Sequence, residues 1–447
     1  MIPKARSQFQ PVRGDLALYR VPNQFCAIMR LMTKRILSLA FFLLLAAVNI
    51  GLIVTNLRPA GAMFGPNNGL EQGFDHTMRR NEVLCLRKGV DPYDVWSEKV
   101  DMPPYYPYVK GTRDKQIYTE PLNAYTPWEY TFILPLSFLP KQTMWWIYNV
   151  FMYMALGIIS LTAFRTMRKE GPDVFDALLV TALPLLLFIP INNDMNVGNY
   201  TLLITAALLA MAEFLGRKMD IAAAIMLAFA MIKPQLALPF AIPLLIKGKL
   251  KTLLVAATIC MLTSIPPAIL CHKSPITLIL QAPQASAHAF NGCALMPKEL
   301  FFFLKDTLYI CEPFLWGIPM LSGVIFCAVF TWRMRQSRNW ILLFAPAALT
   351  AVSWTYVQGY SYILYAIVII AMAVDMIRRP LRSNIILCSA AILLMARSGR
   401  AFEIVVNAAL PSLNGFAAIV CSWSSTAAFI LVFIWLMSLP RSANAHA

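Results

Sequence analysis

Long apolar stretches recur along almost the whole chain, and they restrict its fold more than any other feature. They lie at about 36–57, 174–191, 199–216, 220–232, 234–246, 252–270, 310–332, 340–356, 360–377, 384–396 and 413–438. A helix needs about 20 mostly apolar residues to cross a bilayer. Hydrophobic residues make up 59% of the 447 residues and charged residues only 13%. The sequence therefore predicts an all-α polytopic membrane protein and excludes a disordered chain and a disulfide-rich secreted scaffold.

Basic residues gather at alternate ends of these stretches. The clusters are Arg30/Lys34/Arg35, Arg165/Arg168/Lys169, Arg217/Lys218, Lys247/Lys249/Lys251, Arg333/Arg335/Arg338, Arg378/Arg379/Arg382 and Arg441. Basic residues in short loops mark the cytoplasmic side. All clusters share that side if residues 127–164 cross once and add a short re-entrant or interfacial segment. We therefore expect about 12 transmembrane helices (11–13), both termini in the cytoplasm, a cytoplasmic tail over 1–35 and a single domain over 36–447.

The formal net charge of +16 is explained by this topology. Of the 38 basic residues, those in the cytoplasmic loops and tail supply nearly all of the excess over the 22 acidic ones. Nucleic acid is therefore not predicted as a partner. The chain has no glycine-rich phosphate loop, no HExxH and no CxxC motif, and its histidines (76, 272, 288, 446) lack ligand spacing. No metal site and no cofactor are predicted.

Residues 58–125 form a large predicted extracytoplasmic loop that is rich in acidic, basic and aromatic residues. Long ordered loops of this kind are usually functional. Residues 74–88 are compatible with a short amphipathic helix at the membrane surface, with Asp75, Arg79 and Glu82 on its polar face and Gly89 after its end. Each of these charges is equally compatible with a solvated salt bridge. In a second outer loop, 271–309, the sequence leaves open whether Cys271 and Cys293 pair.

Four segments appear in an order that resembles glycosyltransferase family 87. Asp75 is followed fourteen residues later by Gly89 and GVDPYD, and then come Tyr125-Thr126-Pro127-Trp128, Gly198-Asn199 and Lys233-Pro234-Gln235. The resemblance extends from about residue 75 to 250, and more weakly to 360. It implies a GT-C-like bundle, with short interfacial helices in the first outer loop, that transfers mannose from a polyprenyl phosphate. The late family segment appears here as Ser353-Trp354-Thr355-Tyr356, without its acid and histidine. The donor sugar is therefore mannose or another hexose or pentose.

Asp75 is the predicted catalytic base, a role that the resemblance implies, with a capping or ion-pairing aspartate as the alternative. The argument for Lys233 comes from the residues themselves. It lies between two apolar runs before Pro234, and ionisable residues within spans are costly and usually face a cavity or a partner. A turn between two half-helices there would direct an ammonium at a lipid phosphate. Arg79 and Arg80 are weaker phosphate-binding candidates.

Further substrate-binding candidates lie on the same predicted side. Tyr125 and Asn199 are included because of their places in the family-like segments. Asn193 and Asp194 belong to a short polar turn and either bind sugar hydroxyls or form the turn. Tyr356 lies in an aromatic corner that either stacks on a sugar or belongs to the interfacial aromatic belt.

Together these features predict an integral-membrane glycosyltransferase of the bacterial cytoplasmic (inner) membrane with its site on the extracytoplasmic side. It would move a sugar from a polyprenyl-phosphate donor to an envelope glycolipid or polysaccharide. The alternative is a secondary transporter or flippase of lipid-linked sugars, although no internal repeat is evident. An O-antigen ligase or polymerase is a third reading, but its large loop usually comes late in the chain.

Overall fold

The computed structural model describes residues 73–96, 125–171, 181–289, 312–353, 359–395 and 427–439, with a few isolated positions before 48 and at 177. Every regular element in these ranges is helical. The elements are α2 (Phe74–Arg87), α3 (Pro92–Trp96), α5 (Pro127–Ile133), η2 (Leu136–Phe138), α6 (Lys141–Lys169), η3 (Leu183–Leu187), α8 (Phe188–Val197), α9 (Thr201–Gly216), α10 (Asp220–Ala230), α11 (Pro234–Ala237), η4 (Leu238–Phe240), α12 (Ala241–Ile246), α13 (Leu250–Thr263), α14 (Ile265–Leu270), α15 (Pro275–Ala289), α17 (Glu312–Arg333), α18 (Trp340–Ser353), η6 (Gly359–Leu364), α19 (Tyr365–Arg378), α20 (Arg382–Met395) and a helix over Ala427–Ser438.

Three of these helices are long and apolar enough to cross a membrane: Lys141–Lys169, Leu250–Leu270 and Ser361–Arg378. The pair Pro190–Val197 and Thr201–Gly216, bent by 117°, is a fourth if it counts as one broken span. Most other predicted spans appear as shorter apolar helices, and 36–57 lies almost wholly outside the described residues. The chain is thus a helical protein with membrane-type helices, and the total of about 12 crossings stays a prediction.

The stretch 127–164 divides as its prolines suggest. The short helix α5 ends at Ile133, η2 follows, and Pro140 precedes the 29-residue α6. Along α6 one face is buried, including Met152 and Ile159, while Val150 and Met154 on the other face are more than half exposed. Apolar side chains on both faces are expected when one face packs on protein and the other meets lipid.

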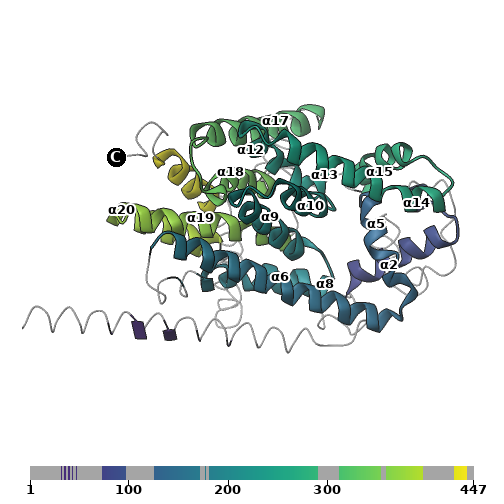
Figure 1. Cartoon of the computed structure of the whole chain (residues 1–447), viewed down its shortest axis with the longest axis horizontal. Helices are drawn as coiled ribbons and strands as arrows, with labels where there is room; N and C mark the ends of the chain where they lie inside the picture. Colours follow the sequence, from purple (N-terminus) through teal and green to yellow (C-terminus); the bar gives the residue numbers. More distant parts are fainter. Residues whose placement is uncertain are drawn as a thin grey trace, which may run out of the picture.

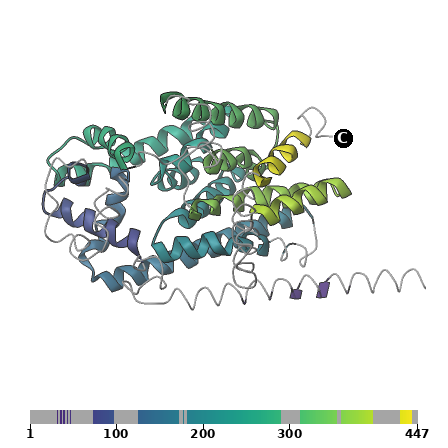
Figure 2. The same ribbon diagram turned by 180° about the vertical axis from the view of Figure 1, so that it is seen from behind.

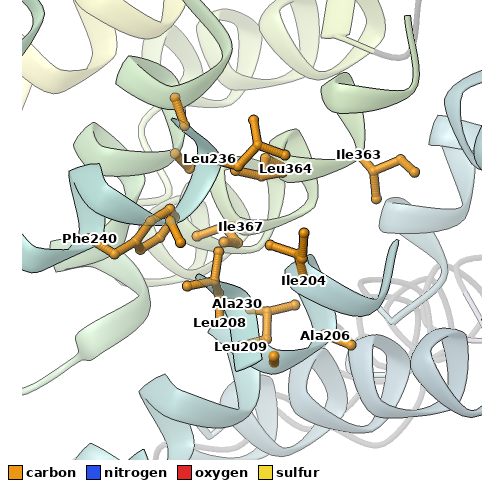
Figure 3. Packing of buried hydrophobic residues seen from close by; sticks show 14 of the residues in the cluster. Ile204, Ala206, Leu208, Leu209, Ala230, Leu236, Phe240, Ile363, Leu364 and Ile367 are labelled. Carbon is orange, nitrogen blue, oxygen red and sulfur yellow. The ribbon is translucent and has the colours of Figure 1, made fainter. Parts of the chain in front are cut away.

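The core lies where α9 packs against α10 and against the consecutive helices η6 and α19. Leu208, Leu209, Ala230, Phe240 and Ile367 are almost fully buried there, and Figure 3 shows their side chains converging from separate helices. Small residues, such as the alanines of α10, allow helices to approach closely. Because α9 packs closely against its neighbours on several sides, its almost wholly apolar residues are buried over most of its length.

Several short helices gather at one end of the molecule, beyond the bundle of long ones (Figures 1 and 2). We call this group, α2, α3, α5, α14 and α15, the end cap. Lys273, just before α15, forms ion pairs with Asp91 and, at 2.6 Å, with Asp94 of α3. Arg87 of α2 donates to the carbonyl of Ser137 at 3.1 Å. The ion pairs tie the first predicted outer loop to the second, and the Arg87 hydrogen bond ties the first loop to η2.

The basic clusters meet at the opposite end. Arg378 pairs with Glu170 at 2.6 Å, Lys247 donates to the carbonyl of Arg335 at 2.8 Å, and Arg333 donates to that of Leu439 at 2.7 Å. The helix ends to which the sequence assigned one membrane side therefore lie together in space. This agrees with the predicted alternation of loops, while the side of the membrane stays a prediction.

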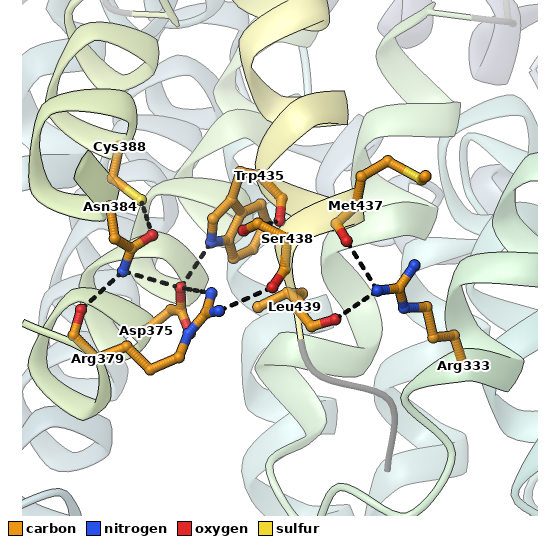
Figure 4. A network of polar contacts seen from close by, with 9 residues as sticks. All are labelled: Arg333, Asp375, Arg379, Asn384, Cys388, Trp435, Met437, Ser438 and Leu439. Carbon is orange, nitrogen blue, oxygen red and sulfur yellow. Dashed lines mark hydrogen bonds and ion pairs between the residues drawn. The ribbon is translucent and has the colours of Figure 1, made fainter. Parts of the chain in front are cut away.

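Asp375 is the centre of a polar network at this end (Figure 4). Its buried carboxylate accepts hydrogen bonds from Arg379 (2.5 and 2.8 Å), from Asn384 at 3.2 Å and from the indole N–H of Trp435 at 2.9 Å. Arg379 in turn donates to the carbonyl of Ser438 at 2.8 Å. One carboxylate thus joins α19, α20 and the helix over Ala427–Ser438.

Replacing Asp375 with Ala is expected to lower the free energy of unfolding by about 3–5 kcal/mol, because it leaves an arginine and an indole N–H without their acceptor. Thermal unfolding of the purified protein in detergent measures the change. Arg382→Gln, at the start of α20 and outside the network, is the control and should shift the midpoint little. Equal midpoints for all three proteins would show that the network does not stabilise the fold.

Candidate functional site

Helix α2 approaches the break between α8 and α9 through two glycines. The N–H of Gly73, which precedes the helix, donates to the carbonyl of Asn196 at 2.7 Å. Gly198 has φ +81°, and a Cβ built there would lie 2.6 Å from the Cβ of His76. Only glycine is accommodated at such a backbone angle and contact without strain. The glycine before Asn199 therefore lets α2 and the start of α9 touch.

That contact brings together four candidates that are far apart in the sequence. The side-chain amide of Asn199 donates to Asp75 Oδ2 at 2.6 Å and to the Tyr125 hydroxyl at 3.1 Å. The ammonium of Lys233 donates to Asn199 Oδ1. Asp75, Asn199 and Lys233 are each at most 5% exposed. A carboxylate and an ammonium are thus joined through one amide in the protein interior.

Lys233 occupies the predicted break between two helices. Helix α10 ends at Ala230 and α11 begins at Pro234, so Lys233 is the residue before the first turn of α11. A proline at this first position fits the helix, because the N–H it lacks would have no helical partner there. The prediction of a half-helix turn at this lysine is confirmed, and the turn places its side chain against Asn199.

Asp194 holds the start of α9 in position. Its carboxylate oxygens accept the backbone N–H groups of Thr201 at 3.2 Å and Leu202 at 2.8 Å, a stabilising arrangement at a helix N-terminus. The hydroxyl of Tyr148, from α6, donates to the carbonyl of Asn199 at 2.6 Å. Asp194 and Tyr148 therefore act as positioning residues for Asn199, and Asp194 performs the turn-forming role that the sequence left open.

Arg79 joins the cluster from α2. Its guanidinium lies 4.0 Å from the centre of the Tyr125 ring and pairs with Glu82 at 2.5 Å, and both charged side chains are fully buried. Lys233 lies 5.4 Å from the same ring. The helix agrees with its predicted bounds, and Gly89 follows it with φ +76°. Its charged face, however, points into the protein and not toward the membrane surface, because α5, α6 and α8 pack against it.

Burial raises the pKa of Glu82 to about 8, although the neighbouring Arg79 opposes the rise. In the unfolded chain this carboxyl loses its proton near 4.5. The folded protein therefore holds one more proton than the unfolded chain between these values, and the stability that this proton contributes is lost as the pH rises through about 8.

We expect the free energy of unfolding of the wild type to fall relative to that of Glu82→Gln as the pH is raised from about 5 to 9. The amide does not titrate, so it removes this contribution and keeps the shape of the side chain. Chemical unfolding of both proteins in detergent across this range measures the difference. A difference that does not change with pH would contradict the shifted pKa.

The remaining candidates are placed differently. Arg80 is half-buried on α2, and Asn193 is half-buried on α8; in the described part of the chain no hydrogen bond or ion pair links either to the cluster. Tyr356 and Cys293 lie outside the described residues, and Cys271 is a buried free thiol. Within the described ranges no group of three or more His, Cys, Asp or Glu side chains is arranged to hold a metal ion.

One acidic residue of the cluster was missed by the sequence reasoning. Glu129 of α5 is fully buried, and burial raises the pKa of its carboxyl group well above the usual value, although Arg79 and Lys233 oppose the rise. The sequence did contain a signal for it. An acid within an apolar, proline-bounded segment is costly in the same way as the embedded Lys233, and it therefore indicates a functional residue. The site therefore combines acids and cations from α2, α5 and the α10–α11 turn with the amide of Asn199, just before α9. This combination permits proton abstraction beside a stabilised anion.

The model of glycosyltransferase family 87 matches residues 123–357, just over half of the chain. No match was found among curated proteins or among solved structures. The matched range contains Tyr125, Glu129, Asn199 and Lys233, whereas α2 with Asp75 precedes it and joins the site through its contacts. The resemblance seen in the sequence is confirmed over this range, and the chain belongs to glycosyltransferase family 87.

Proposed function

We propose that this glycosyltransferase moves a sugar from a polyprenyl phosphate to a hydroxyl group of an envelope glycolipid or polysaccharide. The acceptor oxygen attacks C1 of the sugar and gives its proton to Asp75. The bond between C1 and the phosphate oxygen breaks, and the electron pair leaves with the polyprenyl phosphate. Lys233 binds that phosphate and stabilises the negative charge that develops on it.

The observation that supports this proposal best is the bridge made by Asn199. Its amide donates to the carboxylate of Asp75, and its carbonyl accepts from the ammonium of Lys233. The reaction needs a base for the acceptor hydroxyl and a cation for the leaving group, close together and shielded from water. The bridge holds both groups close together. In the proposed reaction, the proton is taken up on one side of the Asn199 amide and the phosphate is bound on the other.

Arg79 and Tyr125 complete the proposed phosphate side of the site. The Arg79 guanidinium stacks on the Tyr125 ring, and this contact together with the Glu82 ion pair restrains its position. The hydroxyl of Tyr125 accepts a hydrogen bond from the same Asn199 amide that donates to Asp75. These residues therefore orient the cluster, and Arg79 adds positive charge to that of Lys233.

We further propose that the site opens on the extracytoplasmic face of the bacterial inner membrane. The site lies beside the end cap, and the basic helix ends lie at the other end of the molecule. Basic loops mark the cytoplasmic side, which places the end cap outside. A polyprenyl chain would then lie in the bilayer with its phosphate at the site, and no soluble cofactor takes part in the proposed reaction.

The test is a transfer assay with the purified full chain in liposomes or detergent. Polyprenyl phosphates carrying labelled mannose, glucose, galactose or arabinose are each offered together with extracted envelope glycolipids and polysaccharides. Release of polyprenyl phosphate together with label on an acceptor is the expected result. Movement of the labelled lipid across liposomes with no cleavage for any donor would overturn the proposal and favour the transporter or flippase.

A further inference from the structure

Glu129 differs from the other buried acids by the absence of hydrogen-bond donors. It is fully buried, and neither of its carboxylate oxygens has a hydrogen-bond partner among the residues that the structure describes. Asp375, in contrast, accepts from three side chains, and Asp194 accepts two backbone N–H groups. A buried polar group without a partner destabilises the protein, because it has lost its hydrogen bonds to water and gained none in their place.

The surroundings of Glu129 indicate what supplies the missing donors. It lies on α5, which packs against α2 and follows Tyr125, whose ring contacts Arg79 and Lys233. Glu129 is therefore placed next to the proposed phosphate site. A fully ionised phosphate has no O–H group and cannot donate a hydrogen bond to the oxygens of Glu129. A group that can satisfy the oxygens of Glu129 is therefore neutral and rich in hydrogen-bond donors. It would be attached to a phosphate that Lys233 binds.

A sugar linked through C1 to a phosphate has these properties. Its hydroxyl groups are donors, and they start two bonds away from the phosphate-bearing carbon. The oxygens of a buried carboxyl group accept hydrogen bonds, whether or not the group carries a proton. Two neighbouring hydroxyls can thus bind one carboxylate at once. The position of α5 is consistent with this, because it begins two residues after Tyr125, whose ring contacts Arg79 and Lys233.

We propose that Glu129 accepts hydrogen bonds from hydroxyl groups of the donor sugar and selects which sugar is transferred. This inference rests on the proposed function and adds to it a specificity-determining residue that makes no contact with the phosphate. Specificity follows because a site built to pair with a hydroxyl rejects a substrate that lacks it, since its own buried polar groups then stay unpaired.

The test compares the binding of two lipids to the purified full chain: polyprenyl phosphate alone and the polyprenyl-phosphate sugar that the wild type transfers best. Glu129→Gln is expected to weaken binding of the sugar-bearing lipid by about 10-fold or more, because the amide replaces one acceptor oxygen with an NH₂ group that only donates. Binding of polyprenyl phosphate alone should change by less than about 2-fold. In transfer assays KM for the donor should rise more than kcat falls. The differences in kcat/KM among the sugars should become smaller than in the wild type.

Two controls separate this role from others. Lys233→Gln should weaken the binding of both lipids, because it removes the phosphate contact. Asp375→Asn changes another buried acid, far from the site, and should lower the thermal midpoint without changing the binding of either lipid. If Glu129→Gln weakens the binding of both lipids equally, or of neither, Glu129 makes no contact specific to the sugar and the inference is overturned. Transfer by the wild type would still support the proposed function in that case, whereas a wild type that transfers none of the sugars refutes both.

Discussion

Replacing Asp75 with Asn is expected to reduce sugar transfer by about 100-fold or more, with donor binding changed by less than about 3-fold. General base catalysis contributes about 10²–10⁴ to a rate. The amide has the shape of the carboxylate and can still accept the hydrogen bond from Asn199, but it cannot take the acceptor proton. Initial rates with saturating donor, measured beside binding of the same donor, separate the loss of the base from a loss of binding.

Asp91→Asn is the matched control for this experiment. Asp91 lies in the same predicted loop and is equally buried. It pairs with Lys273 and accepts the backbone N–H of Tyr93 at 2.8 Å, and neither of these contacts includes a side chain of the Asn199 cluster. This variant should lose thermal stability and keep transfer activity within about 3-fold. Full transfer by Asp75→Asn would refute the assignment of the base, and a comparable loss in both variants would point to the folding of the end cap.

Replacing Lys233 with Gln is expected to lower kcat/KM for transfer by about 100-fold or more. The variant removes the cation that meets the leaving phosphate, and removing one group that stabilises developing negative charge costs about 10²–10³. Binding of polyprenyl phosphate without sugar should weaken as well, because the phosphate contact exists before the reaction. Steady-state kinetics and lipid binding with the same preparation measure the two effects.

Lys273→Gln is the control, because Lys273 is the lysine that pairs with Asp91 and Asp94 between α3 and α15. It should leave the binding of polyprenyl phosphate unchanged. Lys233→Arg keeps the charge and should recover part of the activity, which tests whether loss in the Gln variant comes from charge and not from misfolding of the α10–α11 turn. Unchanged binding of polyprenyl phosphate by Lys233→Gln would remove this residue from the phosphate site.

The half-helix turn at Lys233 shows how far local reasoning reaches. An embedded lysine followed by proline, between two short apolar runs, allows few structures, and the structure has α10 ending at Ala230 and α11 beginning at Pro234. The same holds for α2, where an amphipathic run is followed by glycine with φ +76°. In both cases the decisive energies are local: a missing N–H, a backbone angle that only glycine tolerates, and the side-chain period of a helix.

The roles of Asp194 and Glu129 show where such reasoning stops. The sequence placed Asp194 in a polar turn and left it undecided between sugar binding and turn formation. Only the tertiary structure shows that its carboxylate accepts the first N–H groups of α9, which supports turn formation. Glu129 was overlooked although it is an acid within an apolar, proline-bounded segment, and that segment alone does not show which residues surround it. Its importance arises from burial by helices that are distant in sequence.

The sequence by itself determined that the chain is a helical protein with membrane-type helices, and it indicated the family. Apolar stretches marked the helices, basic loops predicted which helix ends lie on one side, and four ordered segments pointed to the family. These signals are carried by short stretches, because hydropathy and helix boundaries depend on near neighbours. The tertiary structure alone decided which charges meet. Asp75, Asn199 and Lys233 are separated by 124 and 34 residues along the chain, and they come together only because Gly73 and Gly198 let α2 pack on the start of α9.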